Sequence, residues 1–534
     1  MTGGEGINWQ KLHVQYDELS FYSNFFFCEL LFTFQLLSVP RVAVIYGSKE
    51  TSEEAWRQAC TALDGTCTVD FVCRNPSDPP HSANNPLSTR IPYGVHHSKI
   101  FLVGYSTGGL RVIIHTANLR YSDIHHKAQA AYIQDFPRKN SSSPTTSAFE
   151  EDLISYMETY QFHKQYRWDD SYTDSTPPKD DRKTTATTQQ QRTITLVEQL
   201  RKYDFSEASV VLIPSTPGYH ELSEEHPIGH LKLRKAISEL ATKEAVSGGS
   251  GNQNNNNNNI SSNSPGPIIC QFSSIGSLTK KYLHRLEASL DVTKAGAAAN
   301  SVDSVQDESK PLNLQLVYPT ADEICNSLEG YRGGRSVPGT SKNVSKDFLQ
   351  PLFRKWSEPQ SFLASLTASR NSNSNSNSSS NNNANSNNDK KEGGIKNPLW
   401  KGSNVPHIKT YYQLGSSNEK EDPSMLWFCV GSHNLSKAAL GDDIQSKIHG
   451  GPRFFVRHWE LSVFVAPSML NARRLVPFEP DRKMPCSSSS EEDVTIPLPY
   501  RPWPLPYSAS DKPWAVDQRY VRLDIFGRRS ASDA

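Results

Sequence analysis

The pattern of hydrophobic and polar positions changes its period several times between residues 41 and 135, as alternating strands and helices require. Apolar runs bounded by turn residues predict buried strands at 41–47, 97–105 and 110–118. Residues 52–63 and 149–160 instead carry apolar side chains at helical spacing, which predicts two amphipathic helices. Strands that alternate with helices in this way indicate an α/β fold with mixed sheets.

A second alternating region contains predicted buried strands at 209–213, 427–431 and 460–466. Two Asn/Ser-rich tracts interrupt this region, near 247–264 and 369–394. Because such tracts cannot bury enough apolar surface to offset the entropy of ordering, we predict that they are disordered insertions. The polar residues 167–192 are predicted to form a long loop, and the Pro-rich segment 497–514 to run irregularly over the surface.

One motif occurs twice, once in each alternating region. VHHSK (95–99) is followed by a strand and HTANL (115–119), and VPHIK (405–409) by a strand and GSHNL (431–435). Each His-x-Lys pair is therefore expected on one strand, and each Asn at the end of the next strand. Such a duplication predicts two pseudo-symmetric domains that share one active site, with their boundary near residue 206.

The two His-x-Lys pairs carry the groups that an anionic phosphate ester requires. Because side chains alternate along a strand, His97 and Lys99 are expected to share one face, as are the histidine and lysine of the second pair. The phosphate-binding groups predicted in this way are Lys99, Lys409, Asn118 and Asn434. Phosphoryl transfer needs mainly positioning and electrostatic stabilisation, which two lysines and two amides supply without a metal ion.

Two histidines permit a reaction in two steps. Neutral His97 attacks phosphorus while protonated His407 donates to the leaving oxygen, and His407 then activates water to hydrolyse the phosphohistidine. Because the imidazoles must hold opposite protonation states, their partners must differ. Glu460 is expected to stabilise one imidazole, and Gln129 to orient the other without adding charge. A single His-x-Lys pair is usually a surface pair, but the doubled pattern favours a catalytic site.

The composition argues against several other classes of protein. The 56 basic and 56 acidic residues balance, so no globally basic nucleic-acid coat is present. None of the eight cysteines forms a CxxC array, which disfavours a structural zinc site and suggests a reducing compartment. Residues 21–40 approach the hydropathy of a membrane span, but Glu29 and Gln35 interrupt them, so we expect a buried helix rather than a membrane anchor.

At these motifs the sequence resembles the tyrosyl-DNA phosphodiesterases, a branch of the phospholipase D superfamily. HHSK, LRVIIHTANL, PHIKTY and SHNLSKAALG are close to that family's two signatures, and QFSSIGSL (271–278) is similar as well. The usual superfamily motif carries an Asp shortly after the Lys, and the lack of that Asp here marks this branch. The resemblance implies two phospholipase D-like α-β-α domains with mixed sheets, residues 1–206 and 207–534.

The resemblance also implies roles for individual residues. His97 would be the nucleophile and His407 the general acid and base, with Gln129 and Glu460 supporting the two imidazoles. The residues expected to contact the DNA strand are Tyr93, Ser274, Ser277, Asn434, Ser436 and Lys437. Alternatives stay open for these contacts: the tyrosine packs, the first two serines cap a helix, or the lysine is a solvated helix residue.

The function implied is hydrolysis of the phosphodiester that joins a DNA 3′ end to a tyrosine, as in a stalled topoisomerase adduct. Such a DNA-repair hydrolase is expected to need no metal or cofactor and to act as an exonuclease on other 3′ adducts. Its expected partners are single-stranded or duplex DNA and a topoisomerase-derived peptide, and we expect a nuclear monomer. Two alternatives stay open: a general or phospholipid phosphodiesterase, and a non-catalytic DNA-end-binding protein.

Overall fold

The computed structural model describes both alternating regions and much of the C-terminal segment. The residues it describes are 41–47, 68–82, 84–105, 108–118, 120–143, 146–161, 168–169, 193–222, 225–247, 265–295, 308–357, 404–415, 423–478 and 493–530. The helices predicted at 21–40 and 52–63 lie outside these ranges, and so do the two Asn/Ser-rich tracts apart from residue 247.

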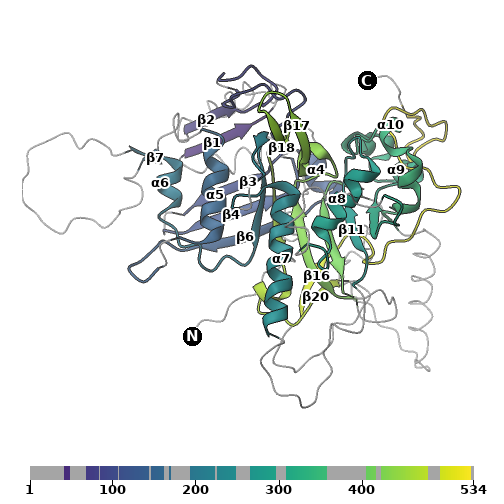
Figure 1. The fold of residues 1–534 in the computed structure, drawn as a ribbon. Helices are drawn as coiled ribbons and strands as arrows, with labels where there is room; N and C mark the ends of the chain where they lie inside the picture. The colour runs from purple at the N-terminus through teal and green to yellow at the C-terminus, as the bar shows by residue number, and fades with distance from the viewer. Residues whose placement is uncertain are drawn as a thin grey trace, which may run out of the picture.

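The first half of the molecule, residues 41–206, is built around a three-stranded antiparallel sheet. Its strands, in spatial order, are β3 (Ile100–Gly104), β4 (Leu110–His115) and β6 (Ala131–Phe136). On β4, Leu110, Val112 and Ile114 are buried and alternate with less buried residues, as expected of a strand with one core face. The helix α5 (Ala148–Glu158) lies beside these strands and packs its buried side chains into the same core (Figure 1).

The second half, residues 207–530, contains a larger mixed sheet. Its strands, in spatial order, are β13 (Phe353–Arg354), β12 (Leu314–Val317), β11 (Ile268–Gln271), β15 (Thr410–Leu414), β16 (Met425–Gly431), β19 (Glu460–Val465) and β9 (Val211–Ser215), with β20 (Leu475–Phe478) beside β16 and β21 (Val494–Pro497) beside β20. β12 pairs in parallel with both β11 and β13. The other neighbouring pairs in this order are antiparallel: β11 with β15, β15 with β16, β16 with β19, and β19 with β9. The long helices α7 (Gly229–Ser247) and α8 (Lys280–Leu290) lie over this sheet (Figure 1).

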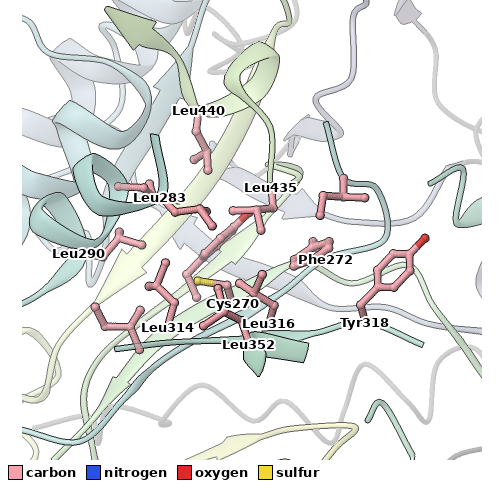
Figure 2. Close-up of a cluster of buried hydrophobic side chains, with 14 of the residues drawn as sticks. Cys270, Phe272, Leu283, Leu290, Leu314, Leu316, Tyr318, Leu352, Leu435 and Leu440 are labelled. Atoms are coloured by element: carbon pink, nitrogen blue, oxygen red, sulfur yellow. The ribbon is translucent and has the colours of Figure 1, made fainter. Parts of the chain in front are cut away.

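Alternation along β16 divides the interior into two hydrophobic cores. Trp427 and Cys429 point into a core that includes Leu283 of α8, part of which is drawn in Figure 2. Phe428 and Val430 point to the opposite face, into a core that is shared with β4 and α5 of the first half. Buried apolar surface therefore joins the two halves, and it fixes the position of one sheet relative to the other.

Short elements complete the described fold. The strands are β1 (Arg41–Tyr46), β2 (Thr68–Cys73), β5 (Lys127–Ala128), β7 (Trp168–Asp169), β8 (Thr193–Ile194), β10 (Gly218–His220), β14 (Val405–Pro406), β17 (Asp442–Ser446) and β18 (Gly451–Val456). The short α- and 3-10 helices are α4 (Tyr121–His125), α6 (Leu196–Leu200), α9 (Ala321–Cys325), η4 (Gly330–Ser336), α10 (Ser341–Val344), η5 (Asp347–Leu352), α12 (Lys437–Leu440) and η6 (Pro467–Met469).

The described elements confirm the predicted α/β fold with mixed sheets. The strand expected at 209–213 begins two residues later, because its pairing with β19 runs from Val211 to Ser215. Residues 168–169, predicted as loop, form β7 because they pair with β8. The division into domains 1–206 and 207–534 stays a prediction, since one hydrophobic core draws residues from both sides of that boundary.

Candidate active site

The two His-x-Lys motifs lie where the halves meet, each against backbone from the other half. The backbone N–H of His97 donates to the carbonyl of Trp459 at 3.0 Å, beside a parallel bridge between His96 and Trp459. In the same way, the N–H of His407 donates to the carbonyl of Ala128 at 3.1 Å, where β14 pairs in parallel with β5. Backbone pairing between the halves thus holds both histidines at the interface.

The motifs were predicted to lie on strands, and this prediction is wrong in detail. β3 begins at residue 100 and β15 at residue 410, so each His-x-Lys pair lies just before its strand, and the second pair follows the two-residue strand β14. The N–H of each histidine is bound by the opposite half, whereas the carbonyls of Lys99 and Lys409 accept from the N–H groups of His115 and Gly431 in their own half. Each lysine ammonium also donates to the carbonyl of its own histidine, Lys99 to His97 at 2.5 Å and Lys409 to His407 at 2.6 Å. The two motifs therefore have matching local geometry.

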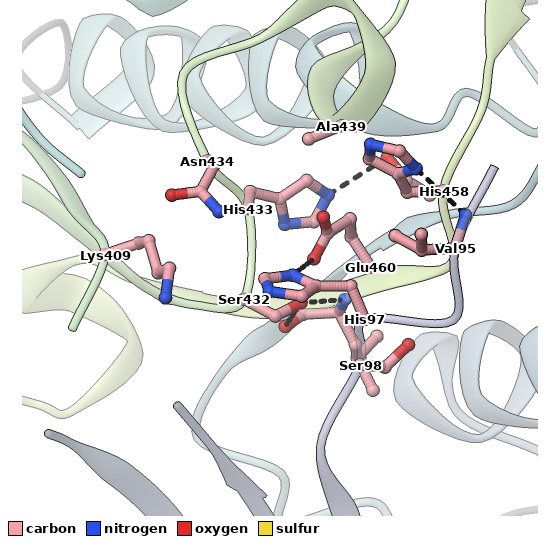
Figure 3. Close-up of polar contacts among 12 residues, drawn as sticks. Val95, His97, Ser98, Lys409, Ser432, His433, Asn434, Ala439, His458 and Glu460 are labelled. Carbon is pink, nitrogen blue, oxygen red and sulfur yellow. Dashed lines mark hydrogen bonds and ion pairs between the residues drawn. The ribbon is translucent and has the colours of Figure 1, made fainter. Parts of the chain in front are cut away.

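The partners of the two imidazoles differ and are exchanged between the halves. Nδ1 of His97 lies 2.8 Å from the carboxylate oxygen Oε2 of Glu460, which begins β19 (Figure 3). Nδ1 of His407 lies 3.1 Å from Nε2 and 3.2 Å from Oε1 of Gln129. A carboxylate from the second half thus holds the first histidine, and a neutral amide from the first half holds the second.

The side chain of Gln129 is fixed at both ends. The hydroxyl of Thr116 donates to Oε1 at 2.7 Å, and Nε2 donates to the backbone carbonyl of Asp123 at 2.9 Å. Because both ends of the amide have partners in the first half, its contact with His407 has a defined orientation. The sequence marked Gln129 as a neutral partner, but it gave no sign that Thr116 would support it.

Burial and positive charge dominate the electrostatics of the imidazoles. Burial, followed by the charges of Lys99 and Lys409, lowers the pKa of His97 well below its ordinary value. The same causes lower the pKa of His407, which is 6% exposed. A phosphodiester anion bound between the lysines would oppose this effect, because a nearby negative charge favours the protonated forms.

Of the two lysines, Lys409 is buried and Lys99 is half-buried, and two carboxylates lie nearby. Burial lowers the pKa of Lys99 to about 8, although the charges of Glu460 and Asp123 act in the opposite direction. The pKa of Lys409, which is 1% exposed, is also lowered, first by burial and then by the charge of Lys99. Desolvated ammonium groups interact strongly with an anion that replaces their lost hydration, so this pair suits a phosphate.

The two asparagines are anchored in different ways. Nδ2 of Asn118 donates to Oδ2 of Asp123 at 2.6 Å. Oδ1 of Asn434 accepts from the backbone N–H of Ser273 at 3.2 Å and of Ser274 at 2.9 Å, which leaves its amide hydrogens for another acceptor. Figure 3 shows Asn434 and Lys409 beside the pair formed by His97 and Glu460.

Comparisons with known proteins agree on one family. A family model described as tyrosyl-DNA phosphodiesterase matches residues 18–175 and 185–508. This chain belongs to the tyrosyl-DNA phosphodiesterase family. The family is one of phosphodiester hydrolases, so the predicted resemblance and the predicted class of enzyme are confirmed.

Individual tyrosyl-DNA phosphodiesterases are similar to this chain over most of its length. Tyrosyl-DNA phosphodiesterase 1 of Arabidopsis thaliana is 26% identical over 92% of this chain and 68% of its own length. The probable tyrosyl-DNA phosphodiesterase of Caenorhabditis elegans is 26% identical over 82% of this chain and 72% of its own. A crystal structure of the yeast tyrosyl-DNA phosphodiesterase superposes with a TM-score of 0.51 at 13% identity, covering 90% of this chain and 88% of that chain, so the fold is shared.

Two segments with predicted DNA contacts in this tyrosyl-DNA phosphodiesterase family member lie against each other. The loop 272–279 meets the start of α12 through a bridge between Ile275 and Leu435, and Gly276 packs so closely on Ser436 that a side chain there would clash. The hydroxyl of Ser277 accepts from Lys346 at 3.2 Å. These contacts bring Ser274, Ser277, Asn434, Ser436 and Lys437 into one region of the surface, which includes one of the asparagines predicted to bind phosphate.

The alternatives for these residues can be tested against their positions. Ser274 and Ser277 do not cap α8, because its N-cap is Thr279, whereas Ser436 does cap α12 by accepting from the N–H of Ala439. Lys437 forms an ion pair with Asp442 at 2.7 Å and is therefore not simply solvated. Their roles toward DNA stay predictions.

Tyr93 is not a packed side chain, since it is 84% exposed. Its backbone φ is +59°, a left-handed conformation that is uncommon for a bulky residue and costs of order 1–3 kcal/mol. The surrounding chain holds this loop, because Arg457 donates to the carbonyl of Pro92 at 2.8 Å. An exposed aromatic ring thus stands four residues before His97 on a constrained backbone.

Sequence reasoning missed several buried polar and charged groups around the site. Asp123 and Lys127 form a buried ion pair behind the first asparagine, and His433 hydrogen-bonds Ser462 at 2.6 Å and Ser215 at 3.0 Å. The i, i+4 spacing of Asp123 and Lys127 was the available signal, but it is common on helix surfaces. Across the described ranges there is no cluster of three or more His, Cys, Asp or Glu side chains that could hold a metal ion. No helix among those described is long and apolar enough to cross a bilayer.

Proposed function

We propose that this chain hydrolyses the phosphodiester that links a DNA 3′ end to a tyrosine side chain and leaves a 3′-phosphate. The observation that carries the proposal is the unequal pairing of the imidazoles, with a carboxylate 2.8 Å from His97 and a neutral amide 3.1 Å from His407. Opposite protonation states require such unequal environments, and membership of the family supports the substrate.

In the first step, Nε2 of His97 attacks phosphorus. The bond from phosphorus to the tyrosine oxygen breaks, and His407 gives its proton to that oxygen, which leaves as neutral phenol. Attack leaves the His97 ring positively charged, and the carboxylate of Glu460 on its Nδ1 stabilises that charge. A neutral partner at this position would not provide this stabilisation.

In the second step, His407 is the base. It takes a proton from water, the water oxygen attacks phosphorus, and the bond between phosphorus and His97 breaks. The products are a 3′-phosphate and both histidines in their starting forms. Gln129 suits this change of role, because its Oε1 can accept from the Nδ1–H that His407 keeps in both forms, and the neutral amide adds no charge that favours either form.

The nonbridging phosphate oxygens are bound by Lys99, Lys409, Asn118 and Asn434 in this proposal. The DNA strand then runs past the region that contains Ser274, Ser277, Ser436 and Lys437, and the ring of Tyr93 stacks on a base. The exposure and the constrained backbone of Tyr93 support that placement, since a ring that is already held in its binding conformation loses little entropy on stacking.

The physiological role that we propose is repair of DNA 3′ ends blocked by topoisomerase-derived peptide, on single-stranded or duplex DNA. Other 3′ adducts would be removed by the same steps, which gives exonuclease activity. We propose that the enzyme acts in the nucleus, as a monomer and without a metal ion or cofactor. The lysines and amides support metal independence, because they supply the charge and the donors that phosphoryl transfer requires.

The test is a gel assay with a labelled oligonucleotide that carries a 3′-phosphotyrosine, in the presence of EDTA. We expect release of tyrosine and a 3′-phosphate product from the full chain. Turnover of a phospholipid with no cleavage of this oligonucleotide would favour the general phosphodiesterase. Binding of the oligonucleotide with no turnover by the wild-type chain would favour the non-catalytic DNA-end-binding protein.

A further inference from the structure

Asp123 is a buried carboxylate in the first turn of α4, and the two-histidine mechanism gives it no role. The residue is 3% exposed. Lys127, four residues later in β5 and 8% exposed, forms an ion pair with it. Burying two charges costs free energy that their attraction often fails to offset, so stability alone does not account for this pair.

Several contacts give the Asp123 carboxylate one defined position. Oδ2 accepts from the side-chain amide of Asn118 at 2.6 Å and from its backbone N–H at 3.2 Å. Oδ1 accepts from Lys127, and the backbone carbonyl of Asp123 accepts from Gln129 at 2.9 Å. The residue is therefore tied to a phosphate-binding amide, a buried cation and the partner of the second histidine.

Asp123 also places negative charge beside the proposed general acid. Its Oδ2 lies 4.0 Å from Nε2 of His407. Since Nδ1 of His407 is the nitrogen held by Gln129, Nε2 is the nitrogen that must carry the proton for the leaving oxygen. The carboxylate is thus on the catalytic side of this imidazole, and no neutral residue could supply the same charge.

The other charged groups that face His407 all disfavour its protonation. They are Lys409, Lys99, His97 and Lys127. Together with burial they lower the pKa of His407 well below its ordinary value, whereas a general acid must be protonated when the leaving oxygen departs. His97 has Glu460 in contact as a counter-charge, but the Gln129 amide gives His407 none.

We propose that Asp123 is a positioning residue that keeps His407 in its proton-donating form, with Asn118 and Lys127 holding the carboxylate in place. This inference rests on the proposed function, since it assigns a charge to the leaving-group side of that reaction. The carboxylate does not contact the reacting atoms. It acts through His407, and its effect should therefore depend on how much the leaving group needs a proton.

The test compares two leaving groups in the variant Asp123→Asn, which removes the charge and keeps the shape. Tyrosine leaves as a basic phenolate and needs a proton, whereas 4-nitrophenol leaves readily without one. We expect single-turnover cleavage of the 3′-phosphotyrosyl oligonucleotide to fall by about 10- to 100-fold, and cleavage of the 3′-(4-nitrophenyl phosphate) oligonucleotide to change by less than about threefold. The alkaline limb for the tyrosyl substrate should also move to lower pH by about one unit.

The matched control is Glu150→Gln, which neutralises another buried carboxylate of the first half. Glu150 is 1% exposed and pairs with Lys139 at 2.8 Å, as Asp123 pairs with Lys127, but it lies in α5. This variant should cleave both substrates at wild-type rates and keep the wild-type pH profile, whatever it does to the melting temperature. Selective loss of the tyrosyl substrate in Glu150→Gln would overturn the assignment.

The double variant Asp123→Asn/Lys127→Met covers the case in which the single variant does not fold, because removing both charges of a buried pair is often neutral for stability. We expect it to keep a selective loss on the tyrosyl substrate. Recovery of both rates would mean that Asp123 only neutralises Lys127, and equal losses on both substrates with an unchanged pH profile would mean that it only supports the site. Failure of the wild-type chain on both substrates would instead contradict the proposed function.

Discussion

The two half-sites, one with His97 and Lys99 and the other with His407 and Lys409, have the same motif and the same contact between lysine and histidine carbonyl. The environments of their imidazoles differ. A carboxylate touches His97, whereas a neutral amide touches His407 and a second carboxylate lies 4.0 Å from its other nitrogen. The two half-sites therefore share the lysines and asparagines that we propose bind phosphate, and they differ in the groups that set the charge of the imidazole. The matching groups suit the nonbridging oxygens of the substrate, whereas the unequal partners of the imidazoles suit opposite protonation states.

Removing His97 should have the largest effect on cleavage and should show that the two histidines are not equivalent. His97→Ala takes away the nucleophile, for which the second half-site offers no substitute, so cleavage should fall by at least about 10⁴-fold. No covalent adduct should form in this variant at any time point. Denaturing gels of a labelled 3′-phosphotyrosyl oligonucleotide measure both quantities, and rapid cleavage through an adduct would contradict the assignment of the nucleophile.

Exchanging the partners of the imidazoles should affect the formation and the hydrolysis of the adduct differently. Glu460→Gln gives both histidines an amide, and the first step should slow by roughly 10²-fold because the cationic His97 loses its counter-charge. Gln129→Glu gives both a carboxylate, which favours protonated His407 and should slow hydrolysis of the intermediate more than its formation. The adduct should therefore accumulate in Gln129→Glu and not in Glu460→Gln, as transient kinetics on gels would show. The opposite pattern would reverse the assignment of acid and nucleophile.

The pH profile should report on the lysines that we propose bind phosphate. Burial lowers the pKa of Lys99 to about 8, so its ammonium is present below that pH and is lost as the pH rises through it. Because kcat/KM reports groups of the free enzyme, loss of this ammonium should steepen its fall above pH 8 by up to about tenfold per pH unit, in addition to any fall caused by His407. Lys99→Arg, whose guanidinium stays charged, should keep a flatter alkaline limb although its absolute rate is lower. An alkaline limb that is identical in the two proteins would show that Lys99 does not titrate there.

The smallest expected effect concerns the DNA strand. Tyr93→Ala removes an exposed ring that is proposed to stack on a base, and binding of an oligonucleotide should weaken by about 1–3 kcal/mol. Tyr93→Phe keeps the ring and is the matched control, so its affinity should equal that of the wild type. Fluorescence anisotropy of a labelled oligonucleotide measures both variants. Equal affinity of the alanine and wild-type proteins would show that this ring does not contact the strand.

The sequence predicted the parts of the site that repeat or that depend on residue type. The doubled His-x-Lys pair and its following Asn pointed to the groups that we propose bind phosphate, and the need for unequal partners pointed to Glu460 and Gln129. Local periodicity did not show that the motifs precede their strands, because backbone from the other half holds them there. This pairing joins residues hundreds of positions apart and leaves no local signal.

Asp123 escaped prediction for a related reason. Its spacing from Lys127 is typical of an exposed helical pair, and only tertiary packing buries both residues and turns the carboxylate toward His407. The strand β9 was placed two residues early for the same reason, since its ends follow from its pairing with β19. Charges and strand ends that depend on distant partners need the three-dimensional structure.

The most direct test of unequal histidines is to locate the covalent bond in the variant His407→Ala. That variant keeps the nucleophile but lacks the acid of the first step and the base of the second. Given an oligonucleotide 3′-(4-nitrophenyl phosphate), whose leaving group needs no proton, it should therefore form an oligonucleotide adduct and accumulate it. Mass spectrometry of the digested protein should place the phosphate on the peptide that contains His97, and mild acid should release it, as expected of a phosphoramidate. An adduct on any other residue, or full wild-type turnover with no adduct, would contradict the account.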